Sequence, residues 1–258
     1  MQIQKFNSDH SISTVIPKIA GMTLYYIPIC VGCFLSYQFY HLFNPKLFTY
    51  QYYEFWNKAN YTGAFQFVFK YWYIFFTITI SNFIGLFVFD NIRVETKKPV
   101  DQLIGGSIAS IFAGISEEIV YRWLWFFSAI GTIALTDWFS GGFLFGHGLT
   151  YLVYIFTKYF VNLATFGILT DYIYSPNWLV GAAMMTAALE FRKGHEQYGV
   201  TGYWFSWYFG LFTQVIVFKF GIMPAIVVHI LVDMMQDVLL FIYSIINRTK
   251  KFKRKKTK

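Results

Sequence analysis

Charged residues are scarce in this chain. Asp, Glu, Lys and Arg make up 13% of its 258 residues, whereas hydrophobic residues make up 56%. Soluble domains usually contain about 25% charged residues, so this composition argues against a soluble globular protein. Runs without any of these four residues cover 19–45, 71–89, 138–157, 172–189 and 197–218. Because a helix that crosses a bilayer needs about 20 mostly apolar residues, we predict an integral membrane protein.

Features that define several other classes are also missing. The chain has no internal repeat, no Pro/Ser-rich linker and no segment of soluble composition, so we predict one all-α membrane domain. Residues 1–18 lack the apolar core of a removable signal peptide, and we expect the first long run to be a retained span. Cys30 and Cys33 lie in that run without a His, Cys or acidic residue nearby. We interpret them as packing residues rather than as a redox or metal pair.

The apolar runs predict a polytopic helical bundle with seven or eight membrane helices. We expect residues 1–102 to form a two-span region, with spans at about 19–43 and 67–89, an aromatic-rich loop at 44–63 that could lie at the membrane interface, and a charged loop at 90–102. The long apolar stretch 103–136 follows, and Lys158 is a possible helix break within 138–175. We expect the last helices at about 177–192, 201–219 and 222–247.

A cluster of basic residues ends the chain. Residues 248–258, RTKKFKRKKTK, are rich in Lys and Arg and contribute much of the net charge of +8. The positive-inside rule places this tail in the cytoplasm, where it could also contact anionic lipid headgroups. Nucleic-acid binding is the rival interpretation of a basic tail, but a tail that adjoins a membrane helix favours the bilayer as its partner. Eight spans would put both chain ends in the cytosol.

Ionisable residues inside the apolar runs carry the functional signal. The stretch ISEEIVYRWLWF, residues 115–126, contains Glu117, Glu118 and Arg122. A charged side chain at the centre of a bilayer costs about 2.5–3.5 kcal/mol, so such residues are functional candidates by default. Glu118 and Arg122 are four residues apart and could pair on one helix face, which would be a purely structural role. Glu117 has no such partner nearby in the sequence and could take and give a proton.

Histidines supply the other candidate groups. His229 and Asp233 are four residues apart in VVHILVDMM, and the Asp233 carboxylate could fix the tautomer of His229. His195 lies in ALEFRKGHEQYG and His147 in GGFLFGHGLTY. A single histidine in an apolar helix is usually a core residue. Two carboxylates, an arginine and at least two histidines at membrane depth together indicate a functional site.

The order of these residues resembles the motifs of the CAAX protease and bacteriocin-processing family (CPBP, or Abi), which includes the prenyl-protein CAAX endopeptidases. The resemblance covers about residues 103–240 and implies that 103–247 is the catalytic membrane core. Its middle motif, F-x-x-x-H, fits both Phe143–His147 and Phe191–His195. The family's usual distance from the first motif favours His147, whereas the block that leads to His229 favours His195. We choose His195, so that 137–175 becomes an insertion and His147 a packing histidine.

The resemblance implies an intramembrane glutamic endopeptidase that needs no cofactor. Glu117 and His195 would position and deprotonate a water molecule, and Glu118 and Arg122 would form a supporting ion pair. His229 and residue 233 would stabilise the oxyanion. The family more commonly has Asn at position 233, and an ionised Asp donates no hydrogen bond. We therefore predict that Asp233 orients His229, the main oxyanion donor. The implied substrate is a membrane-associated peptide, either a prenylated CAAX protein or a leader peptide.

Two alternatives remain open. A catalytic zinc could be held by Glu117, His195 and His229, although the chain has no H-E-x-x-H motif. From another functional class, the chain could be a non-catalytic immunity or scaffold protein, or a transporter with a buried ion pair. Transporters usually show internal symmetry or paired broken helices, and the sequence shows neither. Convergence of Glu117, His195 and His229 around one cavity that can hold a water molecule would favour the enzyme, whereas side chains that face separate helix interfaces would argue against it.

Overall fold

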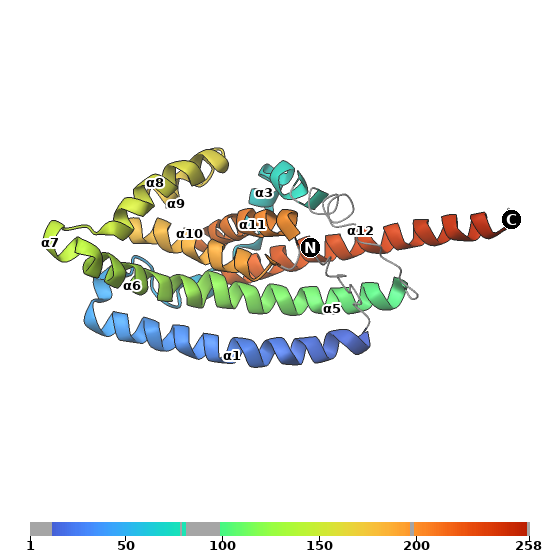
Figure 1. The fold of residues 1–258 in the computed structure, drawn as a ribbon, viewed down its shortest axis with the longest axis horizontal. Coiled ribbons are helices and arrows are strands. Elements are labelled where there is room, and N and C mark those ends of the chain that lie inside the picture. The colour runs from blue at the N-terminus through green and yellow to red at the C-terminus, as the bar shows by residue number, and fades with distance from the viewer. Residues whose placement is uncertain (1–11, 78, 81–98, 197–198, 257–258) are drawn as a thin grey trace, which may run out of the picture.

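The computed structural model describes residues 12–77, 79–80, 99–196 and 199–256, with their side chains except at 12, 201 and 247–256. Every regular element within these ranges is a helix (Figure 1), which confirms the predicted all-helical class. The longer helices are α1 (Ile12–Phe43), α3 (Tyr61–Lys70), α5 (Pro99–Glu117), α6 (Phe126–Asp137), α8 (Leu149–Ala164), α10 (Trp178–Lys193), α11 (Gly199–Phe220) and α12 (Ile222–Lys256). Short helices are η1 (Pro45–Leu47), α2 (Glu54–Asn57), α7 (Phe143–Phe145) and α9 (Thr170–Ile173). Two π-helical segments, η2 (Glu118–Trp125) and η3 (Trp138–Gly142), follow α5 and α6.

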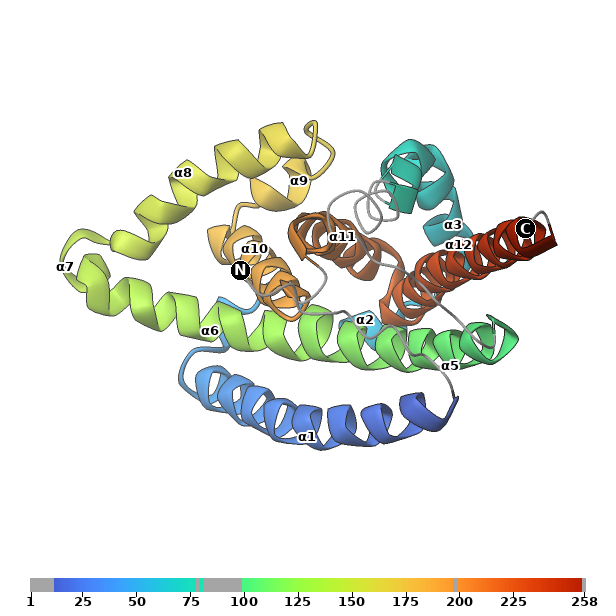
Figure 2. The ribbon, with the colours of Figure 1, turned by 45° about the vertical axis from the view of Figure 1, so that its right-hand side comes forward.

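The helices pack in layers around α5 and α6. Helix α1 lies on one side of α5 and α6, and α10 and α12 lie on the other side (Figure 2). Helix α11 packs against α10 and α12, and α3 covers α11 and α12. The outward faces of α1 carry exposed apolar side chains such as Leu24 and Phe43. In a chain of this composition, lipid is the environment that such faces fit.

Three helical segments are long and apolar enough to cross a membrane: Ser13–Phe43, Pro99–Phe145 and Ile222–Ile246. The predicted count of seven or eight spans is not confirmed. Helices α8 and α10 have 16 residues each, or about 24 Å of helix, which is shorter than the roughly 30 Å apolar thickness of a bilayer. The expected span at 67–89 and the charged loop at 90–102 lie partly outside the described residues.

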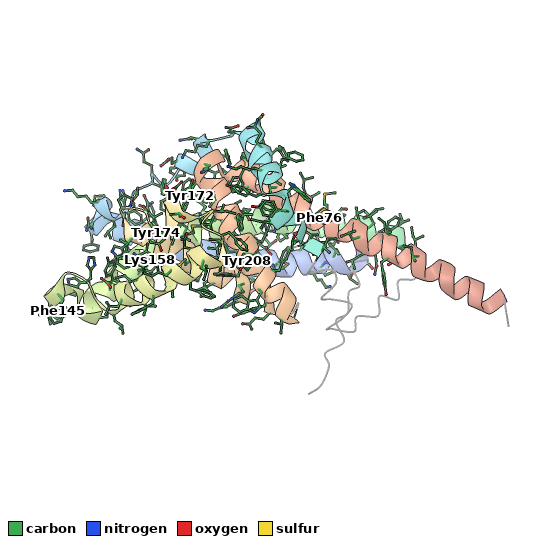
Figure 3. All side chains as sticks on the ribbon, turned by 90° about the horizontal axis from the view of Figure 1, so that it is seen from above. Phe76, Phe145, Lys158, Tyr172, Tyr174 and Tyr208 are labelled. Carbon is green, nitrogen blue, oxygen red and sulfur yellow. The ribbon has the colours of Figure 1, made fainter. Side chains whose placement is uncertain are left out.

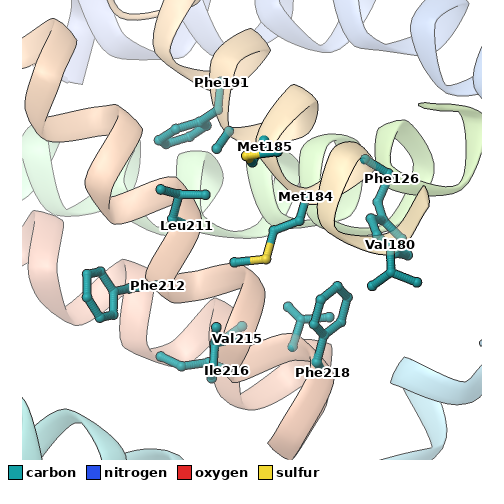
Figure 4. Packing of buried hydrophobic residues seen from close by; sticks show 14 of the residues in the cluster. Phe126, Val180, Met184, Met185, Phe191, Leu211, Phe212, Val215, Ile216 and Phe218 are labelled. Carbon is teal, nitrogen blue, oxygen red and sulfur yellow. The ribbon is translucent and has the colours of Figure 1, made fainter. Parts of the chain in front are cut away.

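Small residues let α10 and α11 approach closely. Gly210 of α11 faces Ala188 of α10, and a Cβ at position 210 would lie 3.3 Å from the Ala188 Cα. Larger side chains fill the remaining space, and Met184 reaches from α10 toward Leu211 and Val215 of α11 (Figure 4). The predicted helices at 177–192 and 201–219 are thus present as α10 and α11, and both contribute buried residues to the main hydrophobic cluster.

The aromatic segment between α1 and α3 enters the core. We expected residues 44–63 to be an interfacial loop, but Tyr52 and Phe55 are buried and pack in the main hydrophobic cluster. The segment is held against α11 by the Lys58 ammonium, which donates to the Phe218 carbonyl at 3.1 Å. Gly221, between α11 and α12, has φ +103°, and a Cβ there would lie 2.0 Å from the Lys58 carbonyl oxygen. Only glycine permits that turn and that contact together.

Residues 137–175, the predicted insertion, form an arm beside the bundle. The helical segment Pro99–Phe145 kinks at Gly141, which has φ +119°. Helix α8 then leads away from α6, and α9 returns toward α10 (Figure 1). The expected break at Lys158 does not occur, because α8 runs through it. The Lys158 ammonium instead lies 5.0–5.5 Å from the ring centroids of Tyr154, Tyr159 and Tyr174. Figure 3 shows Lys158 beside Tyr174. These cation–π contacts stabilise the charge within the helix.

Candidate functional site

Three helices bring the predicted ionisable residues together. Glu117 is the last residue of α5, and Glu118 and Arg122 belong to the π-helical segment that follows. His195 comes directly after α10, and His229 lies in the first half of α12. Helix α12 packs along α5 and η2, and α10 also contacts η2. The cluster therefore forms at one junction, from residues that are far apart in the chain.

The π-helical segment Glu118–Trp125 carries two charged residues of the cluster, Glu118 and Arg122. Its backbone hydrogen bonds join residues five apart rather than four apart. Such widened turns are rare in proteins as a whole, but those that occur are often found at functional sites. The amide Nε2 of Gln214 on α11 donates to the Arg122 carbonyl of this segment at 3.1 Å. Both consecutive glutamates, Glu117 and Glu118, contact side chains of other helices from the start of this widened turn.

Glu118 holds His229 in a fixed orientation. Nδ1 of His229 lies 2.8 Å from Oε1 of Glu118, and the two side chains are 2% and 0% exposed. An ionised carboxylate can only accept a hydrogen bond, so Nδ1 carries the proton and donates it. The Glu118–Arg122 pair predicted from the sequence is present at 3.5 Å, but the same oxygen of Glu118 has its shorter contact with His229.

Arg122 is the fully buried cation of the cluster. Its Nε donates to the Thr213 hydroxyl at 2.9 Å, and its guanidinium lies 4.0 Å from the centroid of the Phe191 ring. Its two terminal nitrogens and Oε2 of Glu118 are buried without a hydrogen-bond partner among the described residues. Each such group costs about 1–3 kcal/mol, so the cluster is not optimised for stability.

Glu117 faces both histidines. Its Oε2 lies 3.7 Å from Nε2 of His195 and 3.7 Å from Nε2 of His229. The Glu117 side chain is 9% exposed, compared with 19% for His195 and 2% for His229. A separation of 3.7 Å is too long for a direct hydrogen bond, so Glu117 is a close neighbour of both imidazole rings without binding either one directly. The partners that Glu117 lacks nearby in the sequence are supplied by α10 and α12.

The last turn of α10 orients His195. Its Nδ1 lies 2.7 Å from the Phe191 carbonyl oxygen, four residues earlier. A carbonyl only accepts, so Nδ1 carries the proton, and in the neutral ring Nε2 presents its lone pair toward Glu117. The Phe191 ring lies 4.4 Å from the His195 ring. Phe191, the phenylalanine of the F-x-x-x-H motif, thus contacts both His195 and Arg122.

Asp233 contacts the ring of His229, which we predicted it to orient. The shorter contact with that ring is the 2.8 Å hydrogen bond that Glu118 accepts from Nδ1. Asp233 lies on the opposite side of the ring, with Oδ2 at 3.5 Å from Nε2 of His229. Its side chain is 30% exposed, which makes it the most exposed group of the cluster. Asp233 therefore lies beside the same ring nitrogen of His229 that faces Glu117.

His147 lies away from this cluster. It follows α7, at the far end of the long α5–α6 helix (Figure 1). Its ring stacks on Tyr151 with centroids 3.8 Å apart, and its Nδ1 lies 4.0 Å from Oδ2 of Asp137. Its side chain is 52% exposed, so it is a surface residue rather than the packing histidine we expected. Of the two candidates for the middle motif, the structure places His195 beside Glu117.

No metal-binding arrangement is present in the part of the chain that the structure describes. There, no three or more His, Cys, Asp and Glu side chains are grouped so that they could hold an ion. Cys30 and Cys33 are free thiols in α1, and Cys33 belongs to the hydrophobic core.

Two residues of the cluster were missed in the sequence. Thr213 and Gln214 are adjacent on α11 and are 0% and 1% exposed. Thr213 binds the side chain of Arg122, and Gln214 binds its backbone carbonyl. The signal that could have identified them is their position, because two consecutive polar residues stand in the middle of the charge-free run 197–218.

Comparison with the known protein families, with curated proteins and with solved structures finds no match to this chain.

Proposed function

We propose that this chain is a multi-pass intramembrane endopeptidase of the CPBP type, which hydrolyses a peptide bond with a water molecule activated by Glu117 and His195. The observation that carries the proposal is the position of Glu117 Oε2, 3.7 Å from Nε2 of both His195 and His229. Three groups that can exchange protons thus surround one point at membrane depth. A hydrolytic water placed there would contact a base and two imidazole nitrogens.

The attack on the peptide begins at Glu117. His195 accepts a hydrogen bond from the water at Nε2, because its Nδ1 proton is held by the Phe191 carbonyl. Glu117 takes one proton as the water oxygen forms a bond to the carbonyl carbon of the substrate. The protein helices around the site exclude bulk water, which strengthens each of these polar contacts.

His229 stabilises the tetrahedral intermediate. With Nδ1 donating to Glu118, a second proton on Nε2 would be directed at the developing oxyanion. Glu118 lies beside Nδ1 of His229, and Glu117 and Asp233 lie beside Nε2. Glu117 then returns its proton to the leaving nitrogen, the C–N bond breaks, and the products are a carboxylic acid and an amine.

The buried polar atoms of Arg122 and Glu118 that lack a hydrogen-bond partner also support the proposal of a catalytic site. Replacing a buried ion pair by well-packed apolar residues is often neutral or stabilising. Here Arg122 and Glu118 are fully buried, and three of their polar atoms have no hydrogen-bond partner among the described residues. A role in holding His229 and Glu117 explains why a membrane helix would keep such a costly arrangement. The substrate we propose is a membrane-associated peptide or lipidated protein, presented from the bilayer or its surface.

Purified protein tests the proposal directly. A prenylated CAAX peptide and a generic membrane peptide are incubated with the wild type and with Glu117→Gln, and cleavage is followed by mass spectrometry. We expect the wild type to cleave at least one peptide, in the presence and absence of a chelator, and Glu117→Gln to cleave neither. Activity lost in chelator and restored by zinc would replace the glutamic mechanism by a metal mechanism. Equal cleavage by the wild type and Glu117→Gln would show that Glu117 takes no part in the reaction.

A further inference from the structure

Two adjacent residues of α11 hold Arg122 at two different points. The Thr213 hydroxyl accepts a hydrogen bond from Nε of Arg122 at 2.9 Å, and the Gln214 amide donates to the Arg122 carbonyl at 3.1 Å. Thr213 and Gln214 are 0% and 1% exposed, and Arg122 is 0% exposed. One helix therefore fixes both the side chain and the backbone of a residue in another helix, without contact with water.

The Thr213 hydroxyl is oriented for this contact. It donates its single hydrogen to the Phe209 carbonyl at 2.9 Å, one turn earlier in α11. Because a hydroxyl has one hydrogen and two lone pairs, the oxygen can then only accept from Arg122. Valine would fill the same volume without accepting a hydrogen bond, so packing alone does not require threonine here.

Arg122 is connected to the reacting groups on two sides. Along its own segment, it shares the π-helical turn with Glu118, which directly follows Glu117. Across the helix interface, its guanidinium lies 4.0 Å from the Phe191 ring centroid. The carbonyl of Phe191 binds Nδ1 of His195 at 2.7 Å. A displacement of Arg122 would therefore move the two members of the proposed water-activating pair relative to each other.

We propose that Thr213 and Gln214 are positioning residues, which set the separation of Glu117 and His195 by holding Arg122 and the π-helical segment in place. The proposal rests on the proposed peptidase function. Neither residue touches the reacting atoms. Their effect passes through Arg122, and a misplacement of about 1 Å at an active site can cost about 100-fold in rate.

Two substitutions each remove one hydrogen bond while nearly keeping the volume: Thr213→Val removes the acceptor for Arg122, and Gln214→Met removes the donor to the Arg122 carbonyl. Thr213→Ser retains the acceptor. Thr165→Val is the matched control. Thr165 is also 0% exposed and donates to a carbonyl one turn earlier, that of Val161 at 2.8 Å, but none of its hydrogen bonds reaches Arg122.

We expect Thr213→Val and Gln214→Met to lower kcat by about 10- to 100-fold with KM within about two-fold of the wild type. Thr213→Ser should keep kcat within about three-fold, and Thr165→Val should match the wild type. A structural role alone would lower the amount of folded protein in both valine variants without changing turnover per folded molecule. If Thr213→Val does not fold, the kcat of Gln214→Met is compared with that of Thr165→Val, and equal values would overturn the positioning role.

Two results separate this proposal from the proposed function. If the wild type cleaves peptide and Glu117→Gln does not, but Thr213→Val and Gln214→Met turn over like Thr165→Val, the peptidase stands and the positioning role is overturned. If the wild type cleaves nothing, hydrogen exchange of the amides at 118–126 decides instead. Faster exchange in Gln214→Met than in Thr165→Val supports the positioning role, and equal exchange overturns it.

Discussion

The Glu118 carboxylate accepts a 2.8 Å hydrogen bond from Nδ1 of His229, 111 residues further along the chain. Both side chains are almost completely buried, so this bond ties α12 to the π-helical segment inside the apolar core. Glu117, the preceding residue, makes no contact this short with either histidine. The two consecutive glutamates therefore have different environments. We propose a structural role for Glu118 and a role in the reaction for Glu117.

Substitution of Glu118 should therefore destabilise the fold. Glu118→Gln leaves the fully buried Arg122 without its counter-ion and weakens the bond to His229. Breaking a buried charge pair by removing one partner costs about 3–5 kcal/mol. Glu117→Gln should change stability by less than about 1 kcal/mol and abolish cleavage. Thermal unfolding of the two variants in detergent provides the measurement, and equal losses of stability would show that structure and reactivity are divided wrongly between the two residues.

Asp233→Asn should retain or increase turnover. The Asp233 carboxylate lies 3.5 Å from Nε2 of His229, where an oxyanion would carry charge of the same sign. An asparagine amide removes this repulsion and adds a hydrogen-bond donor. Asp233→Leu, which removes both charge and hydrogen bonding, is the comparison and should be slower than the wild type. An inactive Asp233→Asn beside an active wild type would mean that the carboxylate itself takes part in the reaction.

Gly114 controls how closely α5 approaches α12. A Cβ at this position would lie 2.5 Å from Cγ1 and 3.2 Å from the backbone nitrogen of Ile230. Gly114→Ala should therefore push α12 away, destabilise the protein by about 1–3 kcal/mol and lower turnover by separating Glu117 from His229. Gly21→Ala in α1 is the control, because no atom lies within 4 Å of its added Cβ. Identical unfolding temperatures for the two variants would contradict this helix contact.

The two ends of the Ile222–Ile246 segment should be accessible from opposite faces of the membrane, with the basic tail in the cytoplasm. Asn57 belongs to the segment that the Lys58–Phe218 hydrogen bond holds against the end of α11, next to the start of α12. In a background with Cys30 and Cys33 replaced by Ser, a cysteine at position 57 should react with an impermeant reagent applied to the non-cytoplasmic face of the membrane. A reporter fused after Lys258 should read as cytoplasmic, and an extracytoplasmic signal would reverse the orientation.

Local patterns in the sequence were enough to predict several parts of the structure. The helices at 177–192, 201–219 and 222–247 follow from apolar runs bounded by polar residues or glycine, and the Glu118–Arg122 pair follows from a four-residue spacing. The helices and the ion pair both depend on interactions within one segment of the chain, and the spacing of residues along the sequence is enough to predict such interactions. The choice of His195 over His147 depended instead on the resemblance of the block that leads to His229, against the spacing from the first motif, and the structure places His195 beside Glu117.

Features that depend on contacts between distant segments could not be predicted. The Glu118–His229 hydrogen bond requires α12 to lie against η2, and nothing in the local sequence specifies that pairing. The π-helical turn is likewise accompanied by a hydrogen bond from Gln214 on another helix. Burial of Tyr52 and Phe55 was missed for a related reason, because aromatic residues between apolar runs are equally typical of a membrane interface.

Turnover of a double-mutant cycle on Glu117 and His195 tests the central claim most directly. If the two side chains act on one water molecule, Glu117→Gln and His195→Ala should each lower turnover per folded molecule by about 100-fold or more. The double variant should be little worse than either, because residues that act as a unit are not additive. His147→Ala, the control, should remain within a few-fold of the wild type. Multiplicative losses in the double variant, or an inactive His147→Ala beside an active His195→Ala, would contradict the site described for Glu117.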